Sequence, residues 1–224
     1  MMNGAARTNG APRVRVRREG LVLDGTTLPL YSGSVHYFHM DPAAWRPALA
    51  SLRGMGLRLV DTYIPWGVHE IAKGRFDFGE GRPALDVVRF LHMARDEGLY
   101  AIVRPGPHIN GELTFFGLPE RIVWDPACQA RSPENHPVVL PMLPACFPVP
   151  SYASDAFLEE VGEWYRALAE KLAPLRYPEG PIVLCQIDNE AGLYFRDGLY
   201  DQDYRPEAAA GFRAFMQKKH GAAA

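Results

Sequence analysis

The sequence alternates short apolar runs with amphipathic helical patterns, and this alternation limits the possible folds more than any other feature. Apolar runs begin at Leu30 and cover residues 57–64, 99–103 and 181–187, and helical patterns cover residues 42–54, 84–97, 155–173 and 206–219. Four strand-then-helix units therefore follow one another. Such alternation is typical of a parallel sheet with crossover helices, which predicts an α/β protein.

Residues at the ends of these patterns support the predicted boundaries. Asp41 and Ser154 each stand directly before a helical pattern, as N-cap residues do, and Gly98 follows the helix predicted to end at residue 97. Ahead of the four units, alternation over residues 14–30 with a turn at Asp24-Gly25 predicts a small β-hairpin. Residues 1–12 are basic and contain glycines, and we expect a disordered tail there.

Two α/β architectures fit four such units. A doubly wound sheet would be complete at this length, whereas a TIM (β/α)8 barrel needs eight units and about 250 residues. Residues 33–36 read Gly-Ser-Val-His, which is not the G-x-G-x-x-G fingerprint that a dinucleotide-binding sheet places after its first strand. The barrel is therefore favoured, with about its first four β/α units present.

The charge balance excludes two large classes of partner. Lys and Arg number 24 against 26 acidic residues, so no strong field recruits nucleic acid or an anionic membrane. A neutral partner such as a carbohydrate fits this balance. The first twenty residues lack the apolar stretch of a secretory signal, and no run is long enough to span a bilayer, so a cytoplasmic protein is expected.

Three cysteines are too few and too widely spaced for a disulfide framework or a zinc site. Reduced thiols are expected at Cys128, Cys146 and Cys185. Pairing of Cys128 with Cys146, which share one long loop, is the alternative in an oxidising compartment.

Polar and aromatic side chains follow the predicted strand of every unit. The four sets are His36 and Tyr37; Tyr63, Trp66, His69 and Glu70; Arg104, His108, Asn110 and Glu112; and Gln186, Asp188, Asn189 and Glu190. In a barrel all four sets converge on the C-terminal mouth, where such enzymes carry out their chemistry. The repetition in register favours a functional site over packing alone.

Carboxylates, amides and aromatic rings in one place suit the hydrolysis of a glycosidic bond. That reaction needs a carboxylic acid to protonate the leaving oxygen and a second carboxylate, which attacks the sugar in the retaining case. Glu190 stands at the exit of an apolar strand, and Asn189 beside it is suited to bind a sugar 2-hydroxyl. Glu190 is the candidate acid/base.

Several motifs resemble one known family. They are Gly33-Ser34-Val35-His36-Tyr37, Thr62-Tyr63-Ile64-Pro65-Trp66 with His69-Glu70, Gly74-Arg75-Phe76-Asp77-Phe78, Arg104-Pro105-Gly106-Pro107, Gly117-Leu118-Pro119 and residues 186–190. In this order and spacing, from about Leu21 to Gly192, they resemble glycoside hydrolase family 35, the β-galactosidases.

The resemblance implies a retaining glycoside hydrolase that acts on β-galactosides or related β-glycosides without a cofactor. It also implies that Glu190 is the acid/base, that Asn189 binds the sugar beside it, and that Tyr63, Asn110 and Glu112 match galactose-contacting positions. Residues 13–224 would then form the N-terminal part of the catalytic barrel.

Some positions depart from the family pattern and are expected to line the pocket, so a sugar other than galactose is an alternative substrate. They are His39 for an Arg, His108 for a Tyr, Asn110-Gly111 for Cys-Ala, Leu113 for a Trp and Ala191 for a Tyr. The family's nucleophilic Glu lies well beyond the acid/base, and none of the 34 residues after Glu190 matches it. A truncated, inactive chain is expected, with a sugar-binding half-barrel as the alternative.

Two structural roles and one rival kind of chemistry are alternatives to these assignments. Glu70 is expected to pair with Arg104, and Trp66 to belong to the core. His36, His39, His69 and Glu70 offer a rival metal site for hydrolysis. It is disfavoured because the three-residue step from His36 to His39 sends the two rings to opposite faces of a strand.

Overall fold

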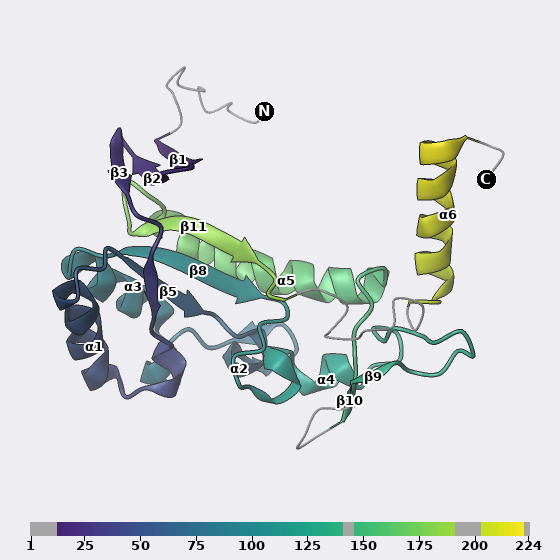
Figure 1. The fold of residues 1–224 in the computed structure, drawn as a ribbon. Coiled ribbons are helices and arrows are strands. Elements are labelled where there is room, and N and C mark those ends of the chain that lie inside the picture. Colours follow the sequence, from purple (N-terminus) through teal and green to yellow (C-terminus); the bar gives the residue numbers. More distant parts are fainter. Residues whose placement is uncertain (1–12, 141–145, 191–202, 222–224) are drawn as a thin grey trace, which may run out of the picture.

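A four-stranded parallel sheet forms the centre of the molecule in the computed structural model, which describes residues 13–140, 146–190 and 203–221. The strands are β4 (Ser32–Ser34), β5 (Leu59–Tyr63), β8 (Tyr100–Gly106) and β11 (Ile182–Ile187), and they lie side by side in chain order (Figure 1). The predicted parallel sheet is confirmed. The tail predicted over residues 1–12 lies outside the described residues.

Three crossover helices connect these strands. They are α1 (Pro42–Gly54), α3 (Val87–Asp96) and α5 (Asp155–Leu172). Their largest buried side chains, Trp45, Phe90 and Trp164, belong to a single core cluster together with Val60 and Ala101 of the sheet. A doubly wound sheet reverses its strand order at a switch point. The order β4-β5-β8-β11 has no reversal among the described strands, so these four strands do not form a complete doubly wound sheet.

The sheet is open at both edges in the described part of the chain. β4 pairs as a strand only with β5, and β11 only with β8, so no closed barrel is present among these residues. β11 carries an exposed Ile187, which is 64% accessible to solvent. The predicted TIM barrel is therefore represented here only by consecutive parallel strands.

Capping side chains fix the helix starts. Asp41 accepts a hydrogen bond from the Ala43 N–H at 2.8 Å, and Ser154 accepts one from the Phe157 N–H at 3.2 Å, as predicted for both. Helix α3 begins at Val87, whereas the sequence predicted a start at residue 84. Asp86 accepts a hydrogen bond from the Arg89 N–H and thereby caps the helix. The residues before it form the short 3-10 helix η2 (Pro83–Leu85).

The N-terminal segment forms a three-stranded antiparallel sheet where the sequence predicted a two-stranded hairpin. Its strands are β1 (Val14–Arg17), β2 (Gly20–Leu23) and β3 (Thr26–Leu28). The chain reverses a first time ahead of Gly20, whose φ of +139° and close approach to the Leu28 carbonyl leave no room for a Cβ. Leucines of this sheet pack against Leu59 and Val183 and cover the N-terminal end of the central sheet.

Shorter elements surround the C-terminal end of the sheet. They are η1 (Tyr37–His39), α2 (Trp66–His69), β6 (Glu70–Ala72), β7 (Arg75–Phe76), η3 (Thr114–Gly117), α4 (Glu120–Val123), β9 (Val139–Leu140) and β10 (Phe147–Pro148). One further short helix, η4 (Ala173–Leu175), follows α5 and leads into the start of β11. The last helix, α6 (Pro206–His220), buries no residue and stands apart from α1, α3 and α5 (Figure 1). None of the helices in the described ranges is long and apolar enough to cross a membrane.

All three thiols are unpaired, and Cys128 is buried. The alternative pairing of Cys128 with Cys146 is therefore not formed.

Replacing Ser154 with Ala should lower the free energy of unfolding by about 1–2 kcal/mol, because the buried Ser154 hydroxyl caps α5 and also donates to the Ala127 carbonyl at 2.7 Å. Urea unfolding measures the change. Ser51→Ala is the matched control, since the Ser51 hydroxyl is exposed and bonds only within its own helix; it should stay within about 0.5 kcal/mol of the parent. Equal effects of the two substitutions would contradict the role of Ser154.

Candidate active site

Polar side chains line one face of the central sheet near the C-terminal ends of its strands. Ser32 and Ser34 donate hydrogen bonds to the Asp61 carboxylate at 2.9 Å, and Arg104 donates to the same carboxylate at 3.3 Å. Asp61 is only 7% exposed. A buried carboxylate needs such partners because burial removes its hydration. These bonds tie β4, β5 and β8 together on the site face.

Arg104 connects this carboxylate to the rest of the site. Its guanidinium carbon lies 4.1 Å from the ring centroid of Tyr63, its neighbour in the β5–β8 register. Its second terminal nitrogen donates to the side-chain oxygen of Asn189. The side chain therefore spans three chain segments, and a planar guanidinium with several donors is suited to this.

Asn189 is held in place by almost all of its side-chain hydrogen-bonding capacity. It is 5% exposed. Its Oδ1 accepts from Arg104 and from Gln186 at 3.1 Å, and its Nδ2 donates to the Ile109 carbonyl at 3.1 Å. These contacts use both lone pairs of the oxygen and one of the two amide hydrogens. Asn189 can therefore address a further group only as a donor.

Glu190 is exposed in the turn after β11 and contacts another predicted site residue. The Asn110 side-chain amide donates to Glu190 Oε2 at 3.2 Å. Burial raises the pKa of Tyr63; Arg104 opposes this increase, and the carboxylates of Glu190 and Glu112 add to it. Tyr63 is therefore a protonated donor at neutral pH. Of the five residues proposed for catalysis and sugar binding, Asn110 bonds to Glu190, which directly follows Asn189. The carboxylates of Glu190 and Glu112 both act electrostatically on Tyr63, and Glu112 is exposed.

Two histidines near these residues are held neutral. His36 stacks on Tyr63 with ring centroids 4.9 Å apart, and burial lowers its pKa. Burial likewise lowers the pKa of His108, which is 0% exposed and donates from Nδ1 to the Asn189 carbonyl at 2.7 Å. His108 was expected to line the pocket; it lies beneath Asn189 instead and supports it.

Glu70 does not pair with Arg104, contrary to the sequence-based expectation. It accepts two hydrogen bonds from Arg121 at 2.9 and 2.7 Å, and Arg121 also contacts Glu160 of α5 at 2.7 Å. Only 4% of the Glu70 side chain is exposed. Glu70 therefore fastens the loop after β5 to α5, and its role is structural, as predicted. Trp66 is 1% exposed and belongs to the core, also as predicted.

His69 is buried in the core, and neither of its ring nitrogens is available to bind a metal. Its Nδ1 donates to the Asp77 carbonyl at 2.7 Å, so its Nε2 accepts from the Tyr37 hydroxyl. Both ring nitrogens are thus used. Among residues 13–140, 146–190 and 203–221, no group of three or more His, Cys, Asp or Glu side chains is arranged to hold a metal ion.

Asp61, Ser32 and Ser34 were not among the residues predicted for the site, and Arg104 was expected to pair with Glu70. One signal was available. Asp61 is a lone charge inside the apolar run 57–64, and a charge on a buried strand requires a partner of opposite sign nearby. The strand-end Arg104 was the available cation.

Comparisons with known proteins place these residues in a family. The family model of glycosyl hydrolases family 35 matches residues 20–137. The human Beta-galactosidase-1-like protein 2 is 33% identical over 84% of this chain and 27% of its own length. The Exo-beta-D-glucosaminidase of Thermococcus kodakarensis is 37% identical over 77% of this chain and 22% of its own. The chain thus spans about a quarter of the length of these curated relatives.

A solved structure shares the fold. The beta-galactosidase from the psychrophilic Marinomonas ef1 superposes with a TM-score of 0.61 over 85% of this chain and 25% of that chain, at 19% sequence identity. The strands and helices described above therefore recur in a known glycosidase fold.

The buried His69 should make the protein less stable in acid. Burial lowers the pKa of His69 from 6.5 to about 4. Its contribution to stability is therefore fully present above pH 6.5 and is lost as the pH falls towards 4, by up to about 3 kcal/mol. Urea unfolding across this range should show a steeper decline for the parent than for His69→Gln, which has no imidazole to protonate. An NMR titration in which the His69 ring ionises near pH 6.5 would contradict this prediction.

Proposed function

The chain belongs to glycosyl hydrolases family 35, and on that premise we propose that the protein containing it hydrolyses β-galactosides or related β-glycosides with retention of configuration. One observation carries the proposal. Glu190 projects at the mouth directly after the buried, fully bonded Asn189, and an amide of a neighbouring loop contacts its carboxylate. A solvent-accessible carboxyl on a firmly held turn is suited to exchange protons with a substrate.

In the proposed reaction, Glu190 donates a proton to the leaving glycosidic oxygen. A second carboxylate, contributed by a part of the protein outside residues 1–224, attacks the anomeric carbon and forms a glycosyl-enzyme. Glu190, now ionised, takes a proton from water, which releases the sugar with its original configuration. The Asn110 amide is suited to both states of Glu190, because an amide can donate to a carboxylate and accept from a carboxylic acid.

The remaining predicted residues are proposed to hold the sugar. Asn189 has one amide hydrogen beyond those used in the described contacts, which suits donation to the sugar 2-hydroxyl. Tyr63, Asn110 and Glu112 surround it with a phenol, an amide and a carboxylate that can address further hydroxyls. The names of the relatives, a beta-galactosidase-like protein and an exo-beta-D-glucosaminidase, support a β-linked terminal sugar.

We further propose that the four strands are the first four of an eight-stranded barrel. Two features support this. The strands follow chain order with their helices in one cluster, as consecutive barrel units do, and the outer edge of β11 is open. An exposed strand edge is a template for pairing that soluble proteins normally cover.

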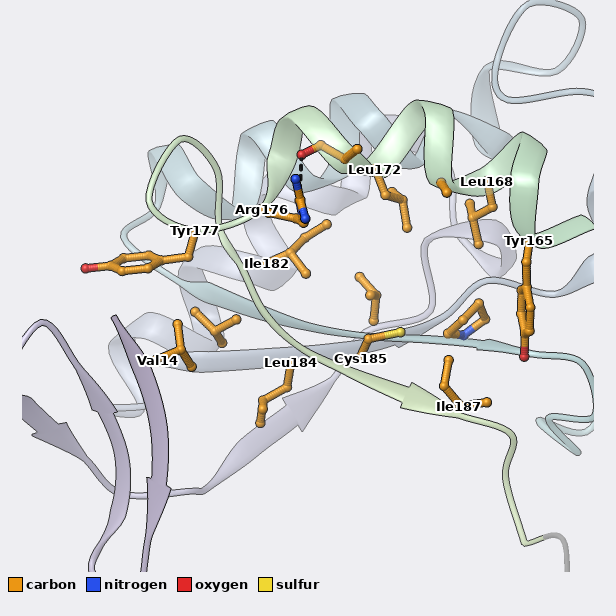
Figure 2. Close-up of a pocket in the computed structure, with 15 residues that line it drawn as sticks. Val14, Tyr165, Leu168, Leu172, Arg176, Tyr177, Ile182, Leu184, Cys185 and Ile187 are labelled. Carbon is orange, nitrogen blue, oxygen red and sulfur yellow. Dashed lines mark hydrogen bonds between the residues drawn. The ribbon is translucent and has the colours of Figure 1, made fainter. Parts of the chain in front are cut away.

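An apolar groove lies where the next unit would pack. It runs between α5 and β11, has a volume of about 600 Å³, and includes Leu168 and Leu172 of the helix with Leu184, Cys185 and Ile187 of the strand (Figure 2). In a barrel, the helix and strand that follow β11 would bury these side chains. The groove is therefore assigned to a fifth β/α unit of the same protein.

The role of Glu190 is tested by Glu190→Gln in the full-length protein. The variant should lose at least about 100-fold in kcat/KM on substrates with poor leaving groups, since it has no acidic proton to give. Cleavage of a nitrophenyl glycoside, whose leaving group needs no protonation, should suffer much less in its first step. Burst kinetics separates formation of the glycosyl-enzyme from its hydrolysis, and circular dichroism reports whether the variant is folded.

Glu159→Gln is the matched control, because Glu159 is exposed on α5. This variant should keep the parental rates. A Glu190→Gln enzyme that cleaves an unactivated disaccharide at the parental rate would refute the assignment.

The partial-barrel proposal is tested by alkylating the thiols. In the isolated 1–224 polypeptide, Cys185 and Cys146 are both exposed and should both react, whereas the buried Cys128 should not. In the full-length protein, the fifth unit should slow modification of Cys185 by about tenfold or more and leave Cys146 reactive. Mass spectrometry of tryptic peptides gives each rate. Equal reactivity of Cys185 in the two proteins would exclude a unit packed in the groove.

A further inference from the structure

Tyr152 contacts the turn that carries the candidate acid/base, although Tyr152 belongs to none of the motifs at the strand ends. It lies in the loop before α5, and its hydroxyl donates to Asp188 Oδ2 at 2.8 Å. Asp188 precedes Glu190 by two residues. Nothing in the sequence around Tyr152 indicates this contact, which joins positions 36 residues apart.

The turn at residues 188–190 is held in an unfavourable backbone conformation. Asp188 has φ of +59° and Glu190 has φ of +50°, both in the left-handed region that side chains with a Cβ rarely adopt. Such conformations persist only where surrounding contacts impose them. The direction of the Glu190 side chain therefore depends on what holds this turn.

Asp188 makes four hydrogen bonds with described residues. Tyr152 forms one of them, and the Gln186 side-chain amide forms another by donating to the Asp188 carbonyl at 3.1 Å. Its N–H donates to the Gly106 carbonyl at 2.7 Å, and its Oδ1 accepts from the His108 N–H at 3.3 Å. Both of these partners belong to the loop at the end of β8. Tyr152 contacts Asp188 from the side of α5, and at 2.8 Å its hydrogen bond is the shorter of the two to the Asp188 carboxylate.

Tyr152 is itself anchored to the core. Its ring meets Phe157 edge-on, with centroids 5.6 Å apart and planes at 87°, and Phe157 is fully buried in the first turn of α5. α5 also donates from Trp164 to the Pro105 carbonyl at 2.9 Å. Helix α5 thus contacts the end of β8, and the loop before it contacts the turn after β11.

We propose that Tyr152 is a positioning residue for Glu190 and acts through Asp188. The hydroxyl holds the Asp188 carboxylate, which holds the left-handed turn and so aims the Glu190 carboxyl at the leaving oxygen. This inference rests on the proposed acid/base role of Glu190. Tyr152 does not touch the sugar in this account, so it affects proton transfer and leaves sugar binding intact.

The test is Tyr152→Phe in the full-length protein, which removes only the hydroxyl. On an unactivated β-glycoside, kcat should fall about three- to tenfold with KM unchanged, the loss expected for one hydrogen bond. The first step on a nitrophenyl glycoside, which needs no proton, should change by less than about twofold. Tyr31→Phe is the matched control, because Tyr31 is 74% exposed; it should behave as the parent.

Amide hydrogen exchange on the full-length protein gives a second readout that needs no activity. Exchange of the Asp188 N–H should accelerate in Tyr152→Phe and stay parental in Tyr31→Phe. Unchanged exchange, or an equal loss of rate on both substrates, would overturn the positioning role. If the parent cleaves no glycoside, the proposed function fails, and the exchange rates alone decide whether Tyr152 holds the turn.

Discussion

The site depends on the interactions of one side chain, the guanidinium of Arg104. It stacks on Tyr63, bonds to Asp61 and bonds to Asn189, so it joins two neighbouring strands to the turn after the fourth. The side chains of Arg104 and Asp61 are 19% and 10% exposed. Removing one partner from a pair buried to this degree costs about 3–5 kcal/mol, because the other charge is left without compensation. A cation at this point therefore holds the polar face of the sheet in one arrangement.

This network lies at the C-terminal end of the central sheet, and the N-terminal end is covered. The N-terminal sheet β1–β3 covers the N-terminal end with leucines, while the strand exits at the C-terminal end are polar. Strand ends can carry polar side chains only where other segments supply the apolar side chains of the core. Here the helices supply it, because α1, α3 and α5 contribute the tryptophans and phenylalanines of the main cluster. The strained turns 110–112 and 188–190, which carry Asn110, Glu112 and Glu190, follow the C-terminal ends of β8 and β11.

Much of this arrangement follows from local sequence signals. The strand-then-helix repeat, the caps at Asp41 and Ser154, and the position of Glu190 at a strand end were predicted from periodicity and neighbouring residues, and the structure has them. Features that depend on distant partners were not predictable in this way. Glu70 pairs with Arg121, 51 residues away, and His108 is buried because Asn189 lies above it. The first turn of the N-terminal sheet lacks a strong hairpin signal, so the separation of β1 from β2 was not predicted.

The central claim is that Glu190 exchanges protons in a retaining reaction, and azide rescue of Glu190→Ala in the full-length protein tests it most directly. Without a base, the glycosyl-enzyme formed from a nitrophenyl glycoside should accumulate, and azide, which needs no deprotonation, should release it. The account predicts that azide restores turnover and that NMR identifies a glycosyl azide with the configuration of the substrate. Turnover that does not respond to azide, or a glycosyl azide of inverted configuration, would contradict it.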